Sequence, residues 1–170
     1  MNFNNLSEIK KAGFIGFKKM SELFKDSSML SEEKGVYFVL YLSNKPPRFM
    51  SIGTGGHFKG KNPNVSIAKL KSNWVDDAIV VYIGKGGGLN QKGKESKATL
   101  KSRLKTYFSF GKGNDVGHSG GRYIWQLKNS KDLVVCWYPT PDKEPAEVET
   151  NFIIEFKINY SKRPFANHKD

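Results

Sequence analysis

The stretch Ala78-Ile79-Val80-Val81-Tyr82-Ile83-Gly84-Lys85 decides the fold more than any other part of the chain. It is mostly apolar and rich in β-branched side chains, and the glycines Gly86-Gly87-Gly88 follow it directly. A short apolar run of this composition that ends in glycine is typical of a buried strand rather than a helix. We therefore expect a β-strand over residues 78–85.

A second run of the same kind lies upstream, at residues 35–42, and a third at residues 133–138. The upstream run also starts with a glycine and carries a tyrosine, Tyr37, near its beginning. If the first two strands are neighbours in a sheet, the phenol groups of Tyr37 and Tyr82 lie side by side. These three runs predict three strands.

Two helices are expected to flank these strands. Ser96 can cap a helix over residues 97–108, and Leu100, Leu104 and Phe108 then form its buried stripe. A second, amphipathic helix is expected over residues 146–160, after a segment broken by prolines. The fold class that follows is α/β (α+β), with a central, mainly antiparallel three-stranded sheet between helices.

The 170 residues suffice for one ordinary domain. Residues 1–34 show apolar side chains at roughly helical intervals, interrupted by glycines, which predicts an N-terminal helical packing arm of two short pieces. The main domain would span residues 35–170, with a long insert at 43–77 between the first two strands. Connections of this length usually have a task or a short structure of their own, and one or two helical turns are expected near Leu70.

The formal net charge of +12 points to a polyanionic partner, either nucleic acid or an anionic membrane surface. Nucleic acid is favoured because no segment is apolar for long enough to span a bilayer and no basic amphipathic helix stands out. The first thirty residues show no signal-peptide pattern, so a cytoplasmic location is expected. The sequence leaves the oligomeric state open.

Cysteine and histidine are scarce. Cys136 is the only cysteine, so no disulfide can form within the chain, and its apolar neighbours predict a buried thiol in the core. With only His57, His118 and His168 beside it, a closed four-ligand zinc site is not expected.

Basic residues gather in two segments and predict a surface that faces phosphates, with an affinity that falls as salt rises. Arg122, which follows a glycine pair further along the chain, lies outside these two segments and is another candidate for DNA contact. The main segment follows the strand at 78–85, and the second lies in the insert. Their members are Lys85, Lys92, Lys94, Lys97, Lys101, Arg103, Lys105 and Lys112 in the first, and Lys59, Lys61, Lys69 and Lys71 in the second.

The order of several motifs resembles that of GIY-YIG endonucleases. Gly35-Val36-Tyr37 is similar to the first signature and Tyr82-Ile83-Gly84 to the second, and the likeness extends over residues 35–167. Arg103 on the next helix, Glu149 on a later helix and Asn167 in the final loop complete the order. The tail and the segment 118–122 look most like small, single-domain bacterial members that are uncharacterised. The chain departs from the family in Val36, in the long insert and in the distance from Tyr82 to Arg103.

The resemblance implies a metal-dependent DNA endonuclease that hydrolyses phosphodiester bonds. Tyr37 would be the general base and Tyr82 would position the water or the phosphate, although the two roles can be exchanged. Arg103 would clamp the phosphate with its planar guanidinium group. Because a free phenol has a pKa of about 10, Lys85 and Arg103 would help the tyrosines to lose a proton.

The same resemblance implies one Mg²⁺ or Mn²⁺ ion, held by Glu149 as a hard oxygen ligand. Glu147 is close enough in sequence to be confused with it. Asn167 would hydrogen-bond to the metal site or to Tyr37, and His118 would contact a phosphate or the leaving group. No small-molecule cofactor is implied.

Two other classes of function remain open. One is a non-catalytic nucleic-acid-binding domain on the same fold, which would keep the basic surface without metal-dependent cleavage. The other is a structural or toxin-neutralising interaction protein, which would bind protein rather than DNA. A P-loop is not predicted at Gly84-Lys85-Gly86-Gly87-Gly88, because the Gly-Lys-Ser/Thr ending is missing.

Overall fold

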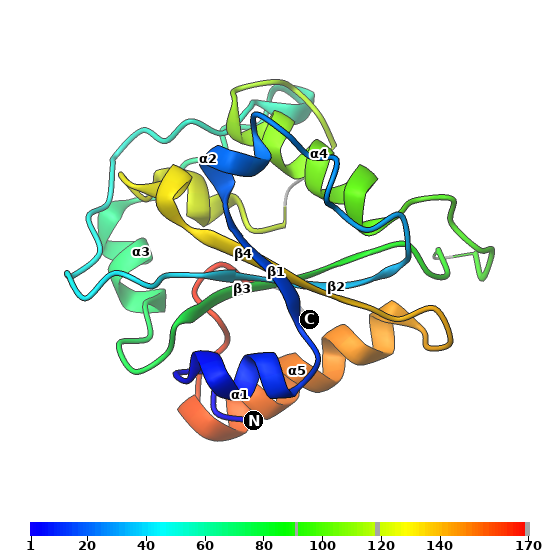
Figure 1. The fold of residues 1–170 in the computed structure, drawn as a ribbon. Coiled ribbons are helices and arrows are strands. Elements are labelled where there is room, and N and C mark those ends of the chain that lie inside the picture. The colour runs from blue at the N-terminus through cyan, green and yellow to red at the C-terminus, as the bar shows by residue number, and fades with distance from the viewer. Residues whose placement is uncertain (91, 118–119, 169–170) are drawn as a thin grey trace.

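The structure, a computed structural model, describes residues 1–90, 92–117 and 120–168. Its centre is a four-stranded antiparallel sheet with the strand order β1-β4-β2-β3. Helices cover both faces of this sheet (Figure 1). The strands are β1 (Ile15–Lys19), β2 (Gly35–Leu40), β3 (Val80–Gly86) and β4 (Val134–Pro139). The mixed α/β class and the antiparallel sheet are therefore confirmed.

The sheet has one strand more than the sequence predicted. The first 34 residues contain α1 (Leu6–Lys11), β1 and α2 (Met20–Leu23), so they are not a purely helical arm. β1 escaped prediction because it is an edge strand that pairs only with β4, and most of its side chains face solvent. It shows no clear alternation, and Gly16, with φ +93°, lies against the Trp137 indole.

β2 lies at the centre of the sheet, and all its residues are buried. Val36 and Phe38 point to the layer of α1 and α5 (Pro145–Tyr160), where Phe14 lies 4.0 Å from Phe38 between ring centroids. Tyr37 points to the opposite layer, which α2 and α4 (Leu100–Gly111) cover. Because side chains alternate along a strand, β2 contributes buried side chains to both layers of the core.

The helices begin where local capping allows. Thr99 caps α4, because its hydroxyl accepts from the Ser102 N–H while the Ser102 hydroxyl accepts from the Thr99 N–H. The helix therefore starts at Leu100, later than the predicted residue 97. Its expected stripe is confirmed, since Leu100, Leu104 and Phe108 are all buried. α5 starts with Pro145, whose missing N–H is not needed in a first turn.

The insert at 43–77 contains a 3₁₀ turn, Phe58–Gly60, and the expected short helix, α3 (Ile67–Asn73), with Leu70 buried. The buried Gln126 amide ties the insert to the domain. It accepts from the Val65 N–H and donates to the carbonyl oxygens of Met50, Ser51 and Val65. Gln126 ends a 3₁₀ helix, Arg122–Gln126, and a second 3₁₀ turn, Ser130–Asp132, precedes β4.

Cys136 lies in the core on β4, as expected, and burial raises the pKa of its thiol. Across the described residues, no helix has both the length and the apolar character needed to cross a membrane.

The packing of Tyr37 on Gly84 gives a test of the fold. A Cβ added at Gly84 would lie 2.6 Å from the Tyr37 hydroxyl oxygen, between two buried strands. We expect Gly84→Ala to lower the free energy of unfolding by about 1–3 kcal/mol because the core must shift to admit the methyl group. Gly117→Ala is the matched control, since its Cβ would meet the Phe58 ring at an ordinary 3.4 Å. Equal urea midpoints for the two variants would contradict this account of the β2–β3 pair.

Candidate active site

Tyr37 and Tyr82 are diagonal neighbours on β2 and β3, as the sequence predicted. Tyr37 is paired with Gly84, and Val39 with Tyr82, so the two tyrosines share one face of the sheet. Their ring centroids lie 5.9 Å apart at an interplanar angle of 69°. β3 is an edge strand, so the tyrosines lie near a border of the sheet and beneath α4.

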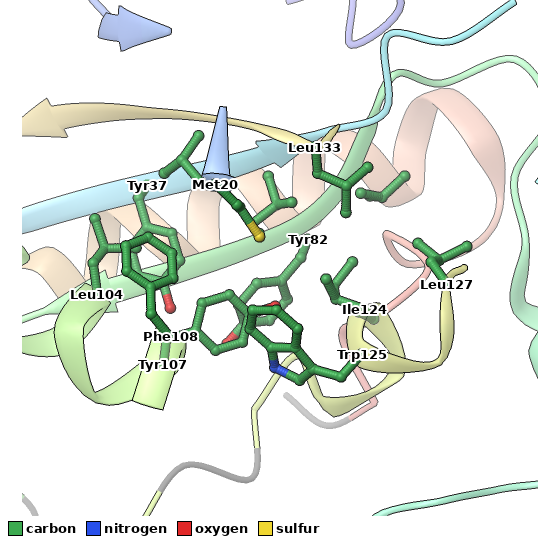
Figure 2. Close-up of a cluster of buried hydrophobic side chains, with 14 of the residues drawn as sticks. Met20, Tyr37, Tyr82, Leu104, Tyr107, Phe108, Ile124, Trp125, Leu127 and Leu133 are labelled. Carbon is green, nitrogen blue, oxygen red and sulfur yellow. The ribbon is translucent and has the colours of Figure 1, made fainter. Parts of the chain in front are cut away.

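A third tyrosine, Tyr107 on α4, completes this cluster (Figure 2). Its ring centroid lies 6.3 Å from that of Tyr37 and 5.7 Å from that of Tyr82. Its hydroxyl donates to the Gly121 carbonyl at 3.2 Å, and a Cβ at Gly121 would lie only 2.8 Å from the Tyr82 ring. Sequence reasoning missed Tyr107, although it follows Arg103 by one helical turn and therefore shares its side of α4.

Burial controls the protonation of these phenols. It raises the pKa of Tyr82 to about 12 and that of Tyr37 well above its ordinary 10. Arg103 lowers both pKa values, as predicted, but burial outweighs it. Both hydroxyls are therefore protonated at neutral pH.

The Tyr37 hydroxyl is buried, and within the described residues it makes no hydrogen bond of normal geometry. The Tyr82 side chain nevertheless raises the pKa of Tyr37. The two hydroxyl groups therefore interact, although their geometry is not that of a well-aligned hydrogen bond. A buried polar atom without a partner is uncommon in native proteins. This oxygen is enclosed in the core, with the Tyr82 hydroxyl as its candidate partner.

Glu149 approaches the tyrosines from α5, on the other face of the sheet. Burial raises the pKa of its carboxyl to about 7, and Lys85 and Arg103 oppose that shift. The carboxylate in turn raises the pKa of Tyr82. Glu149 precedes the buried Ile153 and Phe156 by four and seven residues, which places it on the helix stripe that packs on the sheet. Glu147 is exposed and lies outside this group.

Four elements thus contribute to one site around the edge strand β3. Tyr37 comes from β2, Tyr82 and Lys85 from β3, Arg103 from α4 and Glu149 from α5. Arg103 lowers the pKa of both phenols and of the carboxyl, so all three groups lie within the electrostatic reach of one guanidinium group. The site joins two phenols, two cations and one carboxylate.

Asn167 belongs to the same edge but has a different role from the one expected. Its amide donates to the Ile83 carbonyl at 2.8 Å and accepts from the Ile83 N–H at 2.9 Å. The neighbouring Ala166 N–H donates to the Val81 carbonyl at 2.9 Å. Asn167 therefore pairs with the edge of β3 like a strand residue, and it makes no hydrogen bond with Tyr37.

The predicted DNA-contacting residues lie in different surroundings. Lys101 is engaged by Glu32 at 2.6 Å, and the Arg122 guanidinium lies over the Tyr123 ring at 5.7 Å. Lys59 lies over the Phe58 ring at 5.4 Å. His118 falls outside the described residues. Among the predicted DNA-contacting lysines, those exposed to solvent are Lys59, Lys61, Lys92, Lys94, Lys97 and Lys105.

Metal binding at this site would depend on a single carboxylate. Nowhere in residues 1–90, 92–117 and 120–168 do three His, Cys, Asp or Glu side chains gather as a group able to hold a metal ion. Mg²⁺ is commonly held by one or two carboxylates and keeps several waters, so one half-buried carboxylate beside a phosphate is a compatible donor set. Glu149 is the candidate ligand.

Comparisons of the chain with protein-family models, curated proteins and solved structures found no match.

The raised pKa of Glu149 predicts a pH-dependent effect on stability. Its carboxyl titrates near 4.5 when unfolded and near 7 when folded, so its favourable contribution is present below pH 4.5 and is lost as the pH rises through 7. We expect Glu149→Gln to be more stable than wild type at pH 8 by about 1–3 kcal/mol, with a smaller difference at pH 5.

Urea unfolding at both pH values, with chelator present, measures this difference. Glu147→Gln is the matched control, because Glu147 is exposed on the same helix. If both variants unfold like wild type at pH 8, the carboxylate of Glu149 is better solvated than the structure indicates.

Proposed function

We propose that the protein is a metal-dependent DNA endonuclease that hydrolyses phosphodiester bonds at the edge of β3. The observation that carries the proposal is the convergence of Tyr37, Tyr82, Arg103 and Glu149, which come from four separate elements. A core without a catalytic task has little reason to hold a half-buried carboxylate and a buried phenol that lacks a regular hydrogen bond around the same edge strand. The resemblance of these same residues to those of GIY-YIG endonucleases supports the proposal.

Phosphodiester hydrolysis needs charge stabilisation at the phosphate and a correctly placed water. Arg103 supplies a fixed cation with a planar fork that fits phosphate oxygens. The unpaired Tyr37 hydroxyl can orient the attacking water from beneath. Lys85, on the same strand as Tyr82, adds a second positive charge.

Glu149 is the residue that would hold Mg²⁺ or Mn²⁺. Bound there, such an ion would supply Lewis-acid stabilisation of the phosphate and a more acidic water. Because the Glu149 charge raises the pKa of Tyr82, neutralisation of that charge would lower the pKa again. This link favours Tyr82 as the phenol that first releases its own proton to solvent and then accepts one from the attacking water, with Tyr37 orienting that water, which exchanges the roles first assigned to them.

DNA is the favoured substrate because the chain carries a net charge of +12 and a lysine-rich loop directly after β3. Lys92, Lys94 and Lys97 in this loop are exposed, and Lys105 is exposed on α4. These side chains can neutralise backbone phosphates on either side of the one being cleaved, with an affinity that falls steeply with salt. Arg103 is only partly exposed, which suits contact with the scissile phosphate itself.

Cleavage of supercoiled plasmid tests the proposal. With Mg²⁺ or Mn²⁺ at low salt, we expect the wild type to nick or cut the plasmid, and chelator to stop it. Glu149→Gln should be at least about 100-fold slower, a loss typical of removing a group that stabilises a transition state, and should still bind DNA. Glu147→Gln, changed two residues away on an exposed position, should cut like wild type.

The other outcomes separate the alternatives. Salt-sensitive DNA binding without cleavage of supercoiled, linear or branched DNA would contradict the nuclease and favour a non-catalytic binding domain. The absence of salt-sensitive binding to any nucleic acid would contradict both and favour a protein-interaction role.

A further inference from the structure

A basic cavity lies beside the candidate active site, between α3 of the insert and the C-terminal segment. It has a volume of about 280 Å³. No Asp or Glu lines it, although the chain has sixteen of them. The lining residues that the argument uses are Lys69, Ser72, Asn73, Lys162, Arg163 and Asn167.

The two walls of this cavity are held together by specific contacts. The Lys162 ammonium group donates to the carbonyl oxygens of Ser72 and Trp74 at 3.3 and 3.5 Å, at the end of α3. The Trp74 and Phe165 rings pack edge to face, with centroids 5.1 Å apart. The cavity is therefore a built feature of the fold, made by joining the insert to the tail.

Asn167 connects this cavity to the active site. It lines the cavity and, through its amide, holds the main chain of Ile83, the residue between Tyr82 and Gly84. Tyr123, also at the cavity, follows Gly121 by two residues, and Gly121 contacts the Tyr82 ring. The cavity thus lies next to the edge where the scissile phosphate is proposed to bind.

The chemistry of the lining fits a phosphate group. Lys69, Lys162 and Arg163 are cationic. The Ser72 hydroxyl and one N–H of the Asn73 amide donate to the Lys69 carbonyl oxygen, so the second Asn73 N–H is the neutral donor left for a ligand. Lys69 is exposed and forms no ion pair within the described part of the chain, so its charge is available to a ligand. An anion can gain charge-assisted hydrogen bonds here without displacing a carboxylate.

Another cavity, at the start of α5, has the reverse character. This larger cavity of about 590 Å³, against α1 and α5, is lined by Asp142, Glu144, Glu147 and Glu155, with only Lys143 as a cation. This surface repels a polyanion. A DNA strand at the β3 edge is therefore directed toward α3 and the tail, away from the outer face of α5.

We propose that the cavity between α3 and the tail is a second phosphate-binding site, which holds a backbone phosphate of the DNA strand next to the one being cleaved. This proposal rests on the proposed nuclease function. It assigns the insert a task, because α3 supplies Lys69, Ser72 and Asn73. The cavity fixes the position of the strand by its backbone and carries no base specificity.

The salt dependence of DNA binding tests this site without requiring cleavage. The affinity of wild type, Lys69→Gln and Lys69→Arg for a 20-base-pair duplex is measured with chelator at several salt concentrations. Lys69→Gln should bind about three- to tenfold more weakly, and the slope of log K against log salt should shrink by about 1. Lys69→Arg should retain most of the affinity. Lys19→Gln, an exposed lysine on the opposite edge strand β1, is the matched control.

Equal affinities and slopes for Lys69→Gln and Lys19→Gln would overturn the proposal. In a second measurement, inorganic pyrophosphate is added as a competitor for DNA binding. The proposal would also be overturned if Lys69→Gln made pyrophosphate a weaker competitor but left DNA binding unchanged, since the cavity would then hold a small anion. If the wild type binds but cuts no DNA, while Lys69→Gln still loses one unit of slope, the phosphate site stands and the nuclease proposal fails separately.

Discussion

The close contact of Tyr37 with Gly84 across the β2–β3 pair is the constraint on which the rest of the structure depends. Only a residue without a side chain allows the phenol to lie flat over the neighbouring strand, with its hydroxyl oxygen 2.6 Å from where a Cβ would be. This contact turns the Tyr37 hydroxyl toward the sheet edge where Tyr82 lies. α4 then covers both phenols with Tyr107, and Asn167 closes the free edge of β3 from outside.

The same arrangement disfavours negative charge at the site. Burial raises the pKa of two phenols and of the Glu149 carboxyl, so three groups are held in surroundings that disfavour their charged forms. Lys85 and Arg103 compensate for only part of this at Glu149. Perturbed groups of this kind gather at functional sites more often than elsewhere, because catalysis needs shifted pKa values. Under the proposed function, the cost of charge at Glu149 and the binding of a cation and a phosphate would have the same physical origin.

Much of this was predictable from the sequence, and the exceptions have physical causes. The runs of β2, β3 and β4 are apolar and short, so periodicity identified them, and helical spacing identified the stripe of α4. β1 was missed because an exposed edge strand next to glycines shows no alternation. The choice between Glu147 and Glu149 depended on the phase of α5 relative to the sheet. The role of Asn167 and the cavity at Lys69 depend on where the tail crosses the insert, which is a long-range contact that no local pattern encodes.

The central claim is that Glu149 holds a divalent cation beside the buried tyrosines. Paramagnetic broadening of tyrosine ring signals in NMR spectra, on titration with Mn²⁺, tests it most directly. The account predicts that Tyr82 and Tyr37 broaden at lower Mn²⁺ concentrations than Tyr41, which lies beyond the far end of β2, and that this preference is lost in Glu149→Gln. Broadening that spares Tyr82, or that persists unchanged in Glu149→Gln, would contradict the claim.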